Sequence, residues 1–374
     1  MVQPTGVQEK CQNCGALTAW DAAAGSLRCP TCGATQALPQ QAIAAHPQQG
    51  DVVEYDLIEA LSRSKGTWRP PPGTKQVKCN ECGAEVEFPD GVTATKCSFC
   101  DSPSVLAQEV RTDMIAPESL VPFAVSRDQS ASAFRTWLHG LWFRPSDLKH
   151  KADISELKGV YIPYWTFDAS VRSNWSADAG YYYYTTESYT TTENGRTVTK
   201  TRQVRHIRWE PCSGTRNDAF DDHLVCASKG LPDGLAQGVC NFNTSALVAY
   251  APQYLQGFLA EAYAIDLKAG WGRAQSDMAN IQLARCAKDV PGDTQRNLRA
   301  NHHFSSTTFK HVLLPIWVAA FRYNEKVFRF LVNGQTGKVA GKAPYSWVKI
   351  LLFVTVLVGL AVGAYLLWRS RNPG

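Results

Sequence analysis

Residues 11–32 read CQNCGALTAWDAAAGSLRCPTC, and residues 79–100 read CNECGAEVEFPDGVTATKCSFC. In both blocks a C-x-x-C pair is followed, after fourteen residues, by a second C-x-x-C pair. Each cysteine of the second block stands 68 positions after its counterpart in the first block. The unit C-x2-C-x14-C-x2-C therefore occurs twice, which indicates an internal duplication.

The cysteine spacing is typical of a metal site. Two thiolates in one tight turn can bind one ion, and a second such turn completes a tetrahedron around it. Gly15, Gly33 and Gly83 each follow a cysteine and allow the left-handed backbone of such a turn, which Asp101 also tolerates. Disulfides or a redox C-x-x-C are disfavoured because the N-terminus has no apolar signal and no βαβ pattern surrounds the pairs. We expect two structural Zn²⁺ ions, each held by four thiolates with no open position for substrate: Cys11, Cys14, Cys29 and Cys32 for one, and Cys79, Cys82, Cys97 and Cys100 for the other.

The fourteen-residue spacers have the pattern of β-hairpins. In the first, Leu17–Trp20 leads out and Ser26–Arg28 returns. In the second, Glu85–Phe88 alternates, Pro89–Gly91 turns, and Val92–Lys96 returns. These patterns predict two zinc ribbons, over residues 8–36 and 76–104.

Residues 37–75 read as a linker between the ribbons. The run Pro70-Pro71-Pro72 indicates a stiff spacer. Leu57, Ile58 and Leu61 have helical spacing within Glu54–Arg63, so we expect one short helix there.

The charge balance favours a protein partner for the ribbons. The whole chain has a mild net charge of +5, but residues 1–110 contain eight Lys or Arg against twelve Asp or Glu. Four thiolates around each Zn²⁺ bring the loaded region to about −8. Nucleic-acid binding gains affinity by neutralising phosphates with cations, so an acidic double ribbon suits DNA poorly.

An uncharged apolar run, Ile350–Trp368, lies near the C-terminus. At about 1.5 Å per residue it measures roughly 28 Å as a helix, close to the ~30 Å hydrocarbon core of a bilayer. Trp347, Tyr365 and Trp368 stand where aromatic residues meet a membrane interface. We therefore expect a transmembrane helix over 350–368, with lipid bilayer as its partner.

The side of the membrane is better indicated by the cysteines than by the flanking charges. Three lysines before the apolar run and Arg369 and Arg371 after it do not decide the orientation. Zinc thiolates need a reducing compartment, and no signal peptide opens the sequence. We expect a tail-anchored, single-pass protein of the plasma (inner) membrane, with residues 1 to about 346 in the cytoplasm.

The body, residues 111–346, reads as α+β and rich in antiparallel strands. A capping box, Ser126-x-x-Gln129, opens one helix, and Gly270–Lys288 has the spacing of another. Glu193-Asn-Gly-Arg196 is a hairpin turn signal, after which Thr197–Trp209 alternates with its Val and Ile side chains expected inward.

Two segments of the body echo each other. Ile162-Pro163-Tyr164-Trp165 aligns with Leu314-Pro315-Ile316-Trp317. The echo predicts two related β-units, and Val327–Leu331 with the Asn333-Gly334 turn predicts a final hairpin.

Motifs of common enzymes do not occur in the sequence. It contains no G-x-x-x-x-G-K-[ST], no H-E-x-x-H and no G-x-S-x-G. His302 and His303 are adjacent and should diverge on a strand, and Asp221-Asp222 reads as turn chemistry. We expect no enzyme, no catalytic residue and no cofactor-binding residue, although dispersed catalytic residues leave an enzyme in the body open. The remaining cysteines should be packing residues: Cys212, Cys226, Cys240 and Cys286.

Taken together, these segments resemble the bacterial TFIIB-type zinc-ribbon membrane proteins, often labelled primosomal protein N′ or superfamily II helicase-like. The similarity rests on the paired cysteines, on GVYIPYWTFDA (159–169), LLPIWVAAFRY (313–323) and FLVNGQTGKVAGKAPYSW (330–347), and on the tail helix. The helicase label implies ATPase motifs that this sequence lacks, so that activity is not carried over.

The resemblance implies a function for a tethered ribbon protein. Some similar membrane zinc-ribbon proteins anchor phage-shock-type envelope-stress proteins at the membrane. We therefore expect a scaffold or adaptor whose ribbons bind a protein partner. The alternative is a DNA-associated, primosome-like accessory protein that uses its ribbons to contact nucleic acid.

Overall fold

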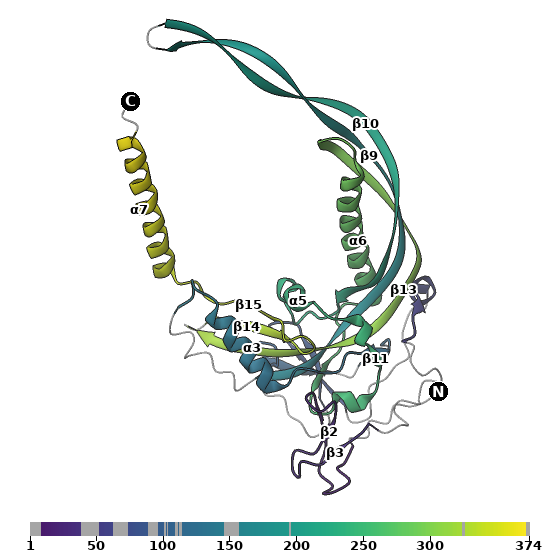
Figure 1. Ribbon diagram of the computed structural model, residues 1–374. Helices are drawn as coiled ribbons and strands as arrows, with labels where there is room; N and C mark the ends of the chain where they lie inside the picture. Colours follow the sequence, from purple (N-terminus) through teal and green to yellow (C-terminus); the bar gives the residue numbers. More distant parts are fainter. Residues whose placement is uncertain are drawn as a thin grey trace.

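The computed structural model describes residues 9–38, 52–62, 74–88, 96–100, 102, 104–108, 111, 114–145, 157–193, 196–323 and 326–371. The described chain is α+β and strand-rich, with five α-helices. A base of sheet and short helices supports two projections that leave it on the same side, a long curved ribbon of β9 and β10 and the helix α7 (Figure 1).

Two long antiparallel strands, β9 (Lys158–Glu193) and β13 (Thr294–Tyr323), form the centre of the sheet. Their register places the two echoing motifs side by side, with Ile162 opposite Leu314. The other edge of β9 pairs with β10 (Arg196–Cys226), beginning at the predicted hairpin turn where Glu193 faces Arg196. The other edge of β13 pairs in the same manner with β14 (Lys326–Asn333), which continues into β15 (Val339–Gly341) as the predicted final hairpin.

Short strands flank this centre in a matching arrangement. β12 (Leu259–Glu261) runs parallel to β9, and β8 (Ser119–Leu120) runs parallel to β13. β12 then pairs with β6 (Glu85–Phe88), while β8 pairs with β11 (Val248–Ala249). This is the arrangement that two related β-units would give, and the duplication of the body stays a prediction.

Both faces of the central sheet are covered, so its strands alternate between two cores. Val160, Ile162 and Tyr164 pack into one cluster, and Tyr161 and Trp165 point to the other side. On that other side Phe134 and Leu138 of α3 (Arg127–His139) cover the lower part of the sheet. Ala274 and Met278 of α6 (Leu267–Asp289) cover the part of the sheet nearer the long β9–β10 hairpin.

One predicted helix start is confirmed, and a second helix begins earlier than predicted. Ser126 Oγ accepts a hydrogen bond from the Gln129 amide at 3.2 Å, and Gln129 Oε1 accepts one from the Ser126 amide at 2.8 Å, which completes the capping box. α6 begins three residues before the predicted Gly270, because the Asp266 carboxylate caps it by accepting from the Ala269 amide at 2.7 Å.

The short helix expected in the linker is α2 (Leu57–Ser62), in which Leu57 is buried and Ile58 is 72% exposed, and the short β4 (Tyr55–Asp56) before it pairs with β13. One expectation about burial was wrong. Ile207 on β10 is 39% exposed rather than turned inward, because the outer part of the ribbon has two strands and no core. The Pro70-Pro71-Pro72 spacer lies outside the described residues.

The apolar tail forms α7 (Trp347–Arg371), a helix of 25 residues. Its most apolar window has a mean hydropathy of 2.7 and none of it is buried. By length and composition this helix can cross a membrane. The other elements are β1 (Ala19–Asp21), β2 (Ser26–Arg28), β3 (Thr35–Gln36), β5 (Lys75–Cys79), β7 (Val105–Gln108), α5 (Asp233–Val239), η1 (Thr244–Ala246) and η2 (Pro252–Leu255).

Candidate metal centres

Each cysteine turn is built by the same backbone hydrogen bonds. In the first turn the Cys11 amide donates to Ala16 O at 2.7 Å and the Gly15 amide donates to Cys11 O at 2.9 Å. Gly15 has φ +74°, the left-handed conformation expected for it. The turns that begin at Cys29 and Cys79 repeat both bonds, with Gly33 and Gly83 in the same conformation. In the fourth turn Cys97 donates to Ser102 O, and Asp101 lies outside the described residues.

The eight cysteines named from the sequence come together as two groups of four, and in each group all four sulfurs lie within 4.8 Å of one another. The closest sulfur pairs are Cys11–Cys32 at 3.5 Å, Cys14–Cys29 at 3.4 Å, and Cys79–Cys100 and Cys82–Cys97 at 3.6 Å. A tetrahedron with metal–sulfur bonds of ~2.3 Å has sulfur–sulfur edges of about 3.8 Å, whereas a disulfide needs ~2.05 Å. Both groups therefore fit structural metal sites with four protein ligands.

The thiols within a group share their protons unequally. The contact between the Cys82 and Cys97 sulfurs lowers the pKa of Cys97 to about 5 and raises that of Cys82 well above its usual value. In the first group, the backbone amide of Ala34 lowers the pKa of Cys32 to about 6. A bound metal replaces the protons that the remaining thiols hold, so metal affinity falls as the pH falls.

The first cluster is half exposed and is docked on the body. Cys11 and Cys29 are buried, while Cys14 and Cys32 are exposed. Trp20 of β1 inserts into the core cluster that also contains Phe134 of α3, where its indole donates to Phe123 O at 3.0 Å and its ring contacts Tyr254 at 4.8 Å between centroids. The predicted hairpin of β1 and β2 is confirmed, and β3 adds a third strand.

The second cluster is part of the body. Cys79, Cys97 and Cys100 are buried in the same hydrophobic cluster as Val160 and Ile162 of the central strand. Glu85–Phe88 forms β6, but its hairpin partner is the preceding strand β5 rather than the predicted return at 92–96, of which residues 92–95 lie outside the described part. β6 also pairs with β12, so the strands beside the second cluster and the body share one sheet.

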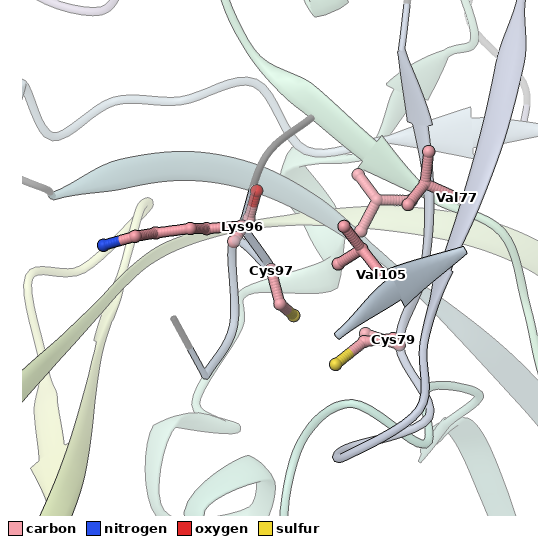
Figure 2. A pocket seen from close by; sticks show the side chains of 8 residues that line it. Val77, Cys79, Lys96, Cys97 and Val105 are labelled. Atoms are coloured by element: carbon pink, nitrogen blue, oxygen red, sulfur yellow. The ribbon is translucent and has the colours of Figure 1, made fainter. Parts of the chain in front are cut away.

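A small apolar hollow borders the second cluster. Figure 2 shows the sulfurs of Cys79 and Cys97 facing one another across it, with Val77 and Val105 on the side of the strands. Ala84 and Val86 complete its apolar lining. Lys96 and Ser98 also border the hollow. Apolar surroundings keep water from the sulfurs, which suits a structural site rather than one that admits a polar substrate.

A group of acidic side chains outside the ribbons already contains its cation. Asp168, Asp221 and Asp222 lie close enough to share an ion. The Lys310 ammonium reaches Asp222 Oδ1 at 2.7 Å and Glu54 Oε1 at 3.0 Å, and the Lys310 side chain is only 5% exposed. The sequence predicted that Asp221 and Asp222 belong to a turn, and the pair forms a β-bulge between Phe220 and His223. The role of Lys310 was not predicted, because its only signal in the sequence is a lone cation beside the apolar run 312–321.

The other residues singled out from the sequence are placed as expected. His302 is half-buried and hydrogen-bonds Ser173 Oγ through Nδ1 at 2.7 Å, while His303 is exposed on the other face of β13. Four cysteines outside the clusters are free and partly or fully buried: Cys212, Cys226, Cys240 and Cys286.

Comparison with known proteins finds a relative that aligns over nearly the whole chain. The chain is 28% identical over 364 residues to the Uncharacterized protein YdjG of Bacillus subtilis (strain 168), an alignment that covers 96% of each protein. No family model matches the sequence. No solved structure matches it either.

Proposed function

We propose that this protein is a tail-anchored membrane scaffold, whose two zinc ribbons are cytoplasmic and whose first ribbon binds a protein partner. The observation that supports this most directly is the position of the first ribbon. Its strands β2 and β3 lie at the opposite end of the molecule from the free end of α7 (Figure 1). A membrane reached by α7 would therefore leave the exposed Cys14–Cys32 edge facing away from the lipid.

Aromatic side chains support the membrane position of α7. Trp347 at the start of the helix is 78% exposed, and Trp142, which follows α3, is 75% exposed. Tyr345 stands between the body and the helix with the Arg144 guanidinium 3.8 Å from its ring centroid. Trp and Tyr favour the membrane–water interface. From Trp347 to Trp368 an α-helix rises about 32 Å, close to the thickness of a hydrocarbon core.

Zinc is the metal we propose for both clusters. Four thiolates at tetrahedral spacing are a soft, closed donor set, which Zn²⁺ takes in structural sites. Such sites need reduced cysteines, and this supports the cytoplasmic side for the body. A tag fused to the N-terminus should then be protected in sealed spheroplasts and become accessible after lysis, whereas access before lysis would contradict the cytoplasmic assignment.

The partner is best sought with the full-length chain in its membrane. We expect crosslinking followed by affinity capture to recover a protein partner, with a membrane-stress protein as the class that the sequence resemblance suggests. The Cys14→Ser/Cys32→Ser variant changes the exposed edge of the first cluster and should lose that partner. The matched control is Cys212→Ser, a half-buried cysteine outside both clusters, which should retain it. Recovery that is equal from both variants would argue against the first ribbon as the binding surface.

The second candidate, a DNA-associated accessory protein, predicts a different result. DNA binding would require phosphate neutralisation and a steep loss of affinity as salt rises. Fluorescence anisotropy of the detergent-solubilised full chain with single- and double-stranded DNA measures this directly. Sub-micromolar binding that the ribbon variant abolishes would favour the accessory-protein reading over the scaffold.

A further inference from the structure

The outer part of the β9–β10 ribbon is an unsupported arm. The third strand, β13, joins β9 only as far as Gly180, where the Asp293 amide donates to Gly180 O and the Asp293 carboxylate accepts from the Tyr182 amide. Beyond this point Tyr181–Glu193 pairs only with Arg196–Arg208 among the described strands. Thirteen residues on each strand span about 40 Å. We refer to these two segments as the arm.

A ribbon of two strands is marginally stable in water, because neither of its faces has a core to cover. Among the described side chains of the arm none is buried. Tyr183, Tyr184 and Tyr189 are 50%, 60% and 42% exposed, and Ile207 is 39% exposed. Ordered apolar and aromatic area of this kind, held away from the body, indicates a surface that is completed by something else.

The charge of the arm limits what that surface can be. Arg196, Lys200, Arg202, Arg205 and Arg208 all lie on β10, against only two carboxylates, Glu187 and Glu193, on β9. One of these carboxylates is already paired, since Glu187 lies 3.2 Å from the Arg202 guanidinium. A surplus of cations disfavours a second copy of the same arm and favours an anionic surface.

Aromatic rings accompany the cations. The Arg205 guanidinium lies 4.4 Å from the centroid of Tyr182, and that of Arg208 lies 5.7 Å from the centroid of Tyr181. Tyr183 stacks on His206 at 5.2 Å. Tyrosine together with Arg and Lys is the side-chain mixture that settles at the headgroup level of a bilayer, with the rings at the interface and the cations at anionic lipids.

The position of the arm supplies the reason to choose lipid. In Figure 1 the arm and α7 leave the base on the same side, and the ribbon of β9 and β10 rises beside α7 and past its free end, so a bilayer that α7 enters lies across the course of the arm. The arm cannot accompany α7 through the hydrocarbon, because an open ribbon would expose unpaired peptide groups and five cations to lipid tails. It must then lie along the surface that it meets.

We propose that the arm, Tyr181–Glu193 with Arg196–Arg208, lies on the headgroup surface of the membrane that anchors the protein and binds anionic lipid. This proposal rests on the membrane anchoring proposed above for α7. The arm would make a second contact with the same bilayer and fix the orientation of the body, since a single helix leaves the body free to rotate.

Amide hydrogen exchange of the full-length chain tests the arm directly. The protein is reconstituted into nanodiscs of phosphatidylcholine, with or without about one third phosphatidylglycerol. We expect exchange of the arm amides to be about tenfold slower in the anionic discs, and the protection to fall at high salt because lipid charges are screened. Equal exchange in both kinds of disc would overturn the proposal.

Variants of Arg205 and Arg208 distinguish the effect of their charge from the effect of guanidinium geometry. Arg205→Glu/Arg208→Glu should abolish the difference between the two discs, whereas Arg205→Lys/Arg208→Lys should retain most of it. The matched control is Lys268→Glu, an exposed lysine on α6 that leaves the arm unchanged, and it should behave as the native protein. Loss of the difference in the lysine variant would overturn the lipid proposal in favour of a partner that reads guanidinium geometry.

Two further results would also overturn it. Arm protection in detergent that rises with protein concentration would identify a second copy as the occupant. Protection that requires added DNA and ignores lipid charge would identify nucleic acid. Failure of the anchoring itself is distinguishable, because the chain would then not co-purify with discs of either composition.

Discussion

Ile162 lies directly opposite Leu314 in the central strand pair, and the surroundings of the two residues correspond step for step. Two residues before each one, Val160 and Val312 pair with parallel strands, β12 and β8. Three residues after each one, a buried tryptophan donates its indole hydrogen to a backbone carbonyl: Trp165 to Ile265 O at 2.9 Å and Trp317 to Val125 O at 2.9 Å. The echo in sequence thus coincides with an approximate two-fold arrangement, which supports a duplicated body.

The contact between α6 and Trp165 depends on a glycine. A Cβ atom at Gly270 would lie 2.6 Å from Trp165 Cδ1, whereas one at Gly272 would have no atom within 4 Å. We expect Gly270→Ala to destabilise the protein by about 1–3 kcal/mol through overpacking. Gly272→Ala, on the same helix, should stabilise it by up to ~1 kcal/mol through helix propensity. Urea unfolding of the full chain in detergent measures both, and equal effects would show that α6 does not dock as described.

Loss of the second metal cluster should destabilise the body more than loss of the first. Zinc-replete protein should contain two Zn²⁺ per chain by elemental analysis, and Cys11→Ser/Cys14→Ser and Cys79→Ser/Cys82→Ser should each lose one. The second variant should also lower the melting temperature of the body, because its cluster lies in the core that contains Val160. The first variant should leave the body folded, since the β1–β2 hairpin contributes only Trp20 and Leu27 to the buried residues of the body's core. Similar melting temperatures for both variants would contradict this division.

The buried ammonium of Lys310 balances three carboxylates. Lys310→Met would leave Glu54, Asp168 and Asp222 without their shared counter-charge, and we expect a loss of roughly 3–5 kcal/mol of stability. Lys268→Met, at an exposed position, should change stability by no more than about 0.5 kcal/mol. Adding Asp222→Asn to Lys310→Met should restore part of the loss. Chemical denaturation of these proteins and of the single Asp222→Asn variant gives the comparison, and an additive double variant would rule out the coupling.

Acid sensitivity should depend on His311. Burial lowers the pKa of His311 to about 4, while its Nδ1 donates to Ile115 O at 3.0 Å. Because the folded pKa is depressed, the stability from the neutral ring is present above the unfolded pKa of about 6.5 and is lost as the pH falls toward 4. The shift corresponds to about 3 kcal/mol. His311→Gln should flatten the stability profile between pH 6.5 and 4 relative to native protein. A parallel profile would assign the acid sensitivity to other groups.

Local features were predictable from the sequence because neighbouring residues determine them. Gly15, Gly33 and Gly83 set the cysteine turns, Ser126 and Gln129 form the capping box, and the apolar composition of the tail defines α7. Each of these depends on contacts within a few residues of the chain.

Features that depend on long-range pairing were not predictable. The alternating pattern predicted a strand over Thr197–Trp209, whereas β10 continues to Cys226 as one strand of 31 residues because β9 pairs with it. The two predicted zinc ribbons looked like free modules, yet Trp20 docks one of them against Phe123 and Tyr254, and β12 joins the other to the body. The Lys310 cluster brings together Glu54, Asp168 and Asp222, whose distances along the chain leave no pattern to recognise.

The pairing of β9 with β13 also limits how early the chain can fold during its synthesis. Pro163 can meet Leu313 only after the ribosome has added residues 164–313, which takes about 10–30 s at the usual rates of elongation. Until then the β9–β10 hairpin has emerged with one long edge unpaired, the kind of edge that recruits other strands. High contact order of this sort slows folding. Newly made chains should therefore bind chaperones that shield extended segments, and this dependence should end when residues near 320 leave the exit tunnel.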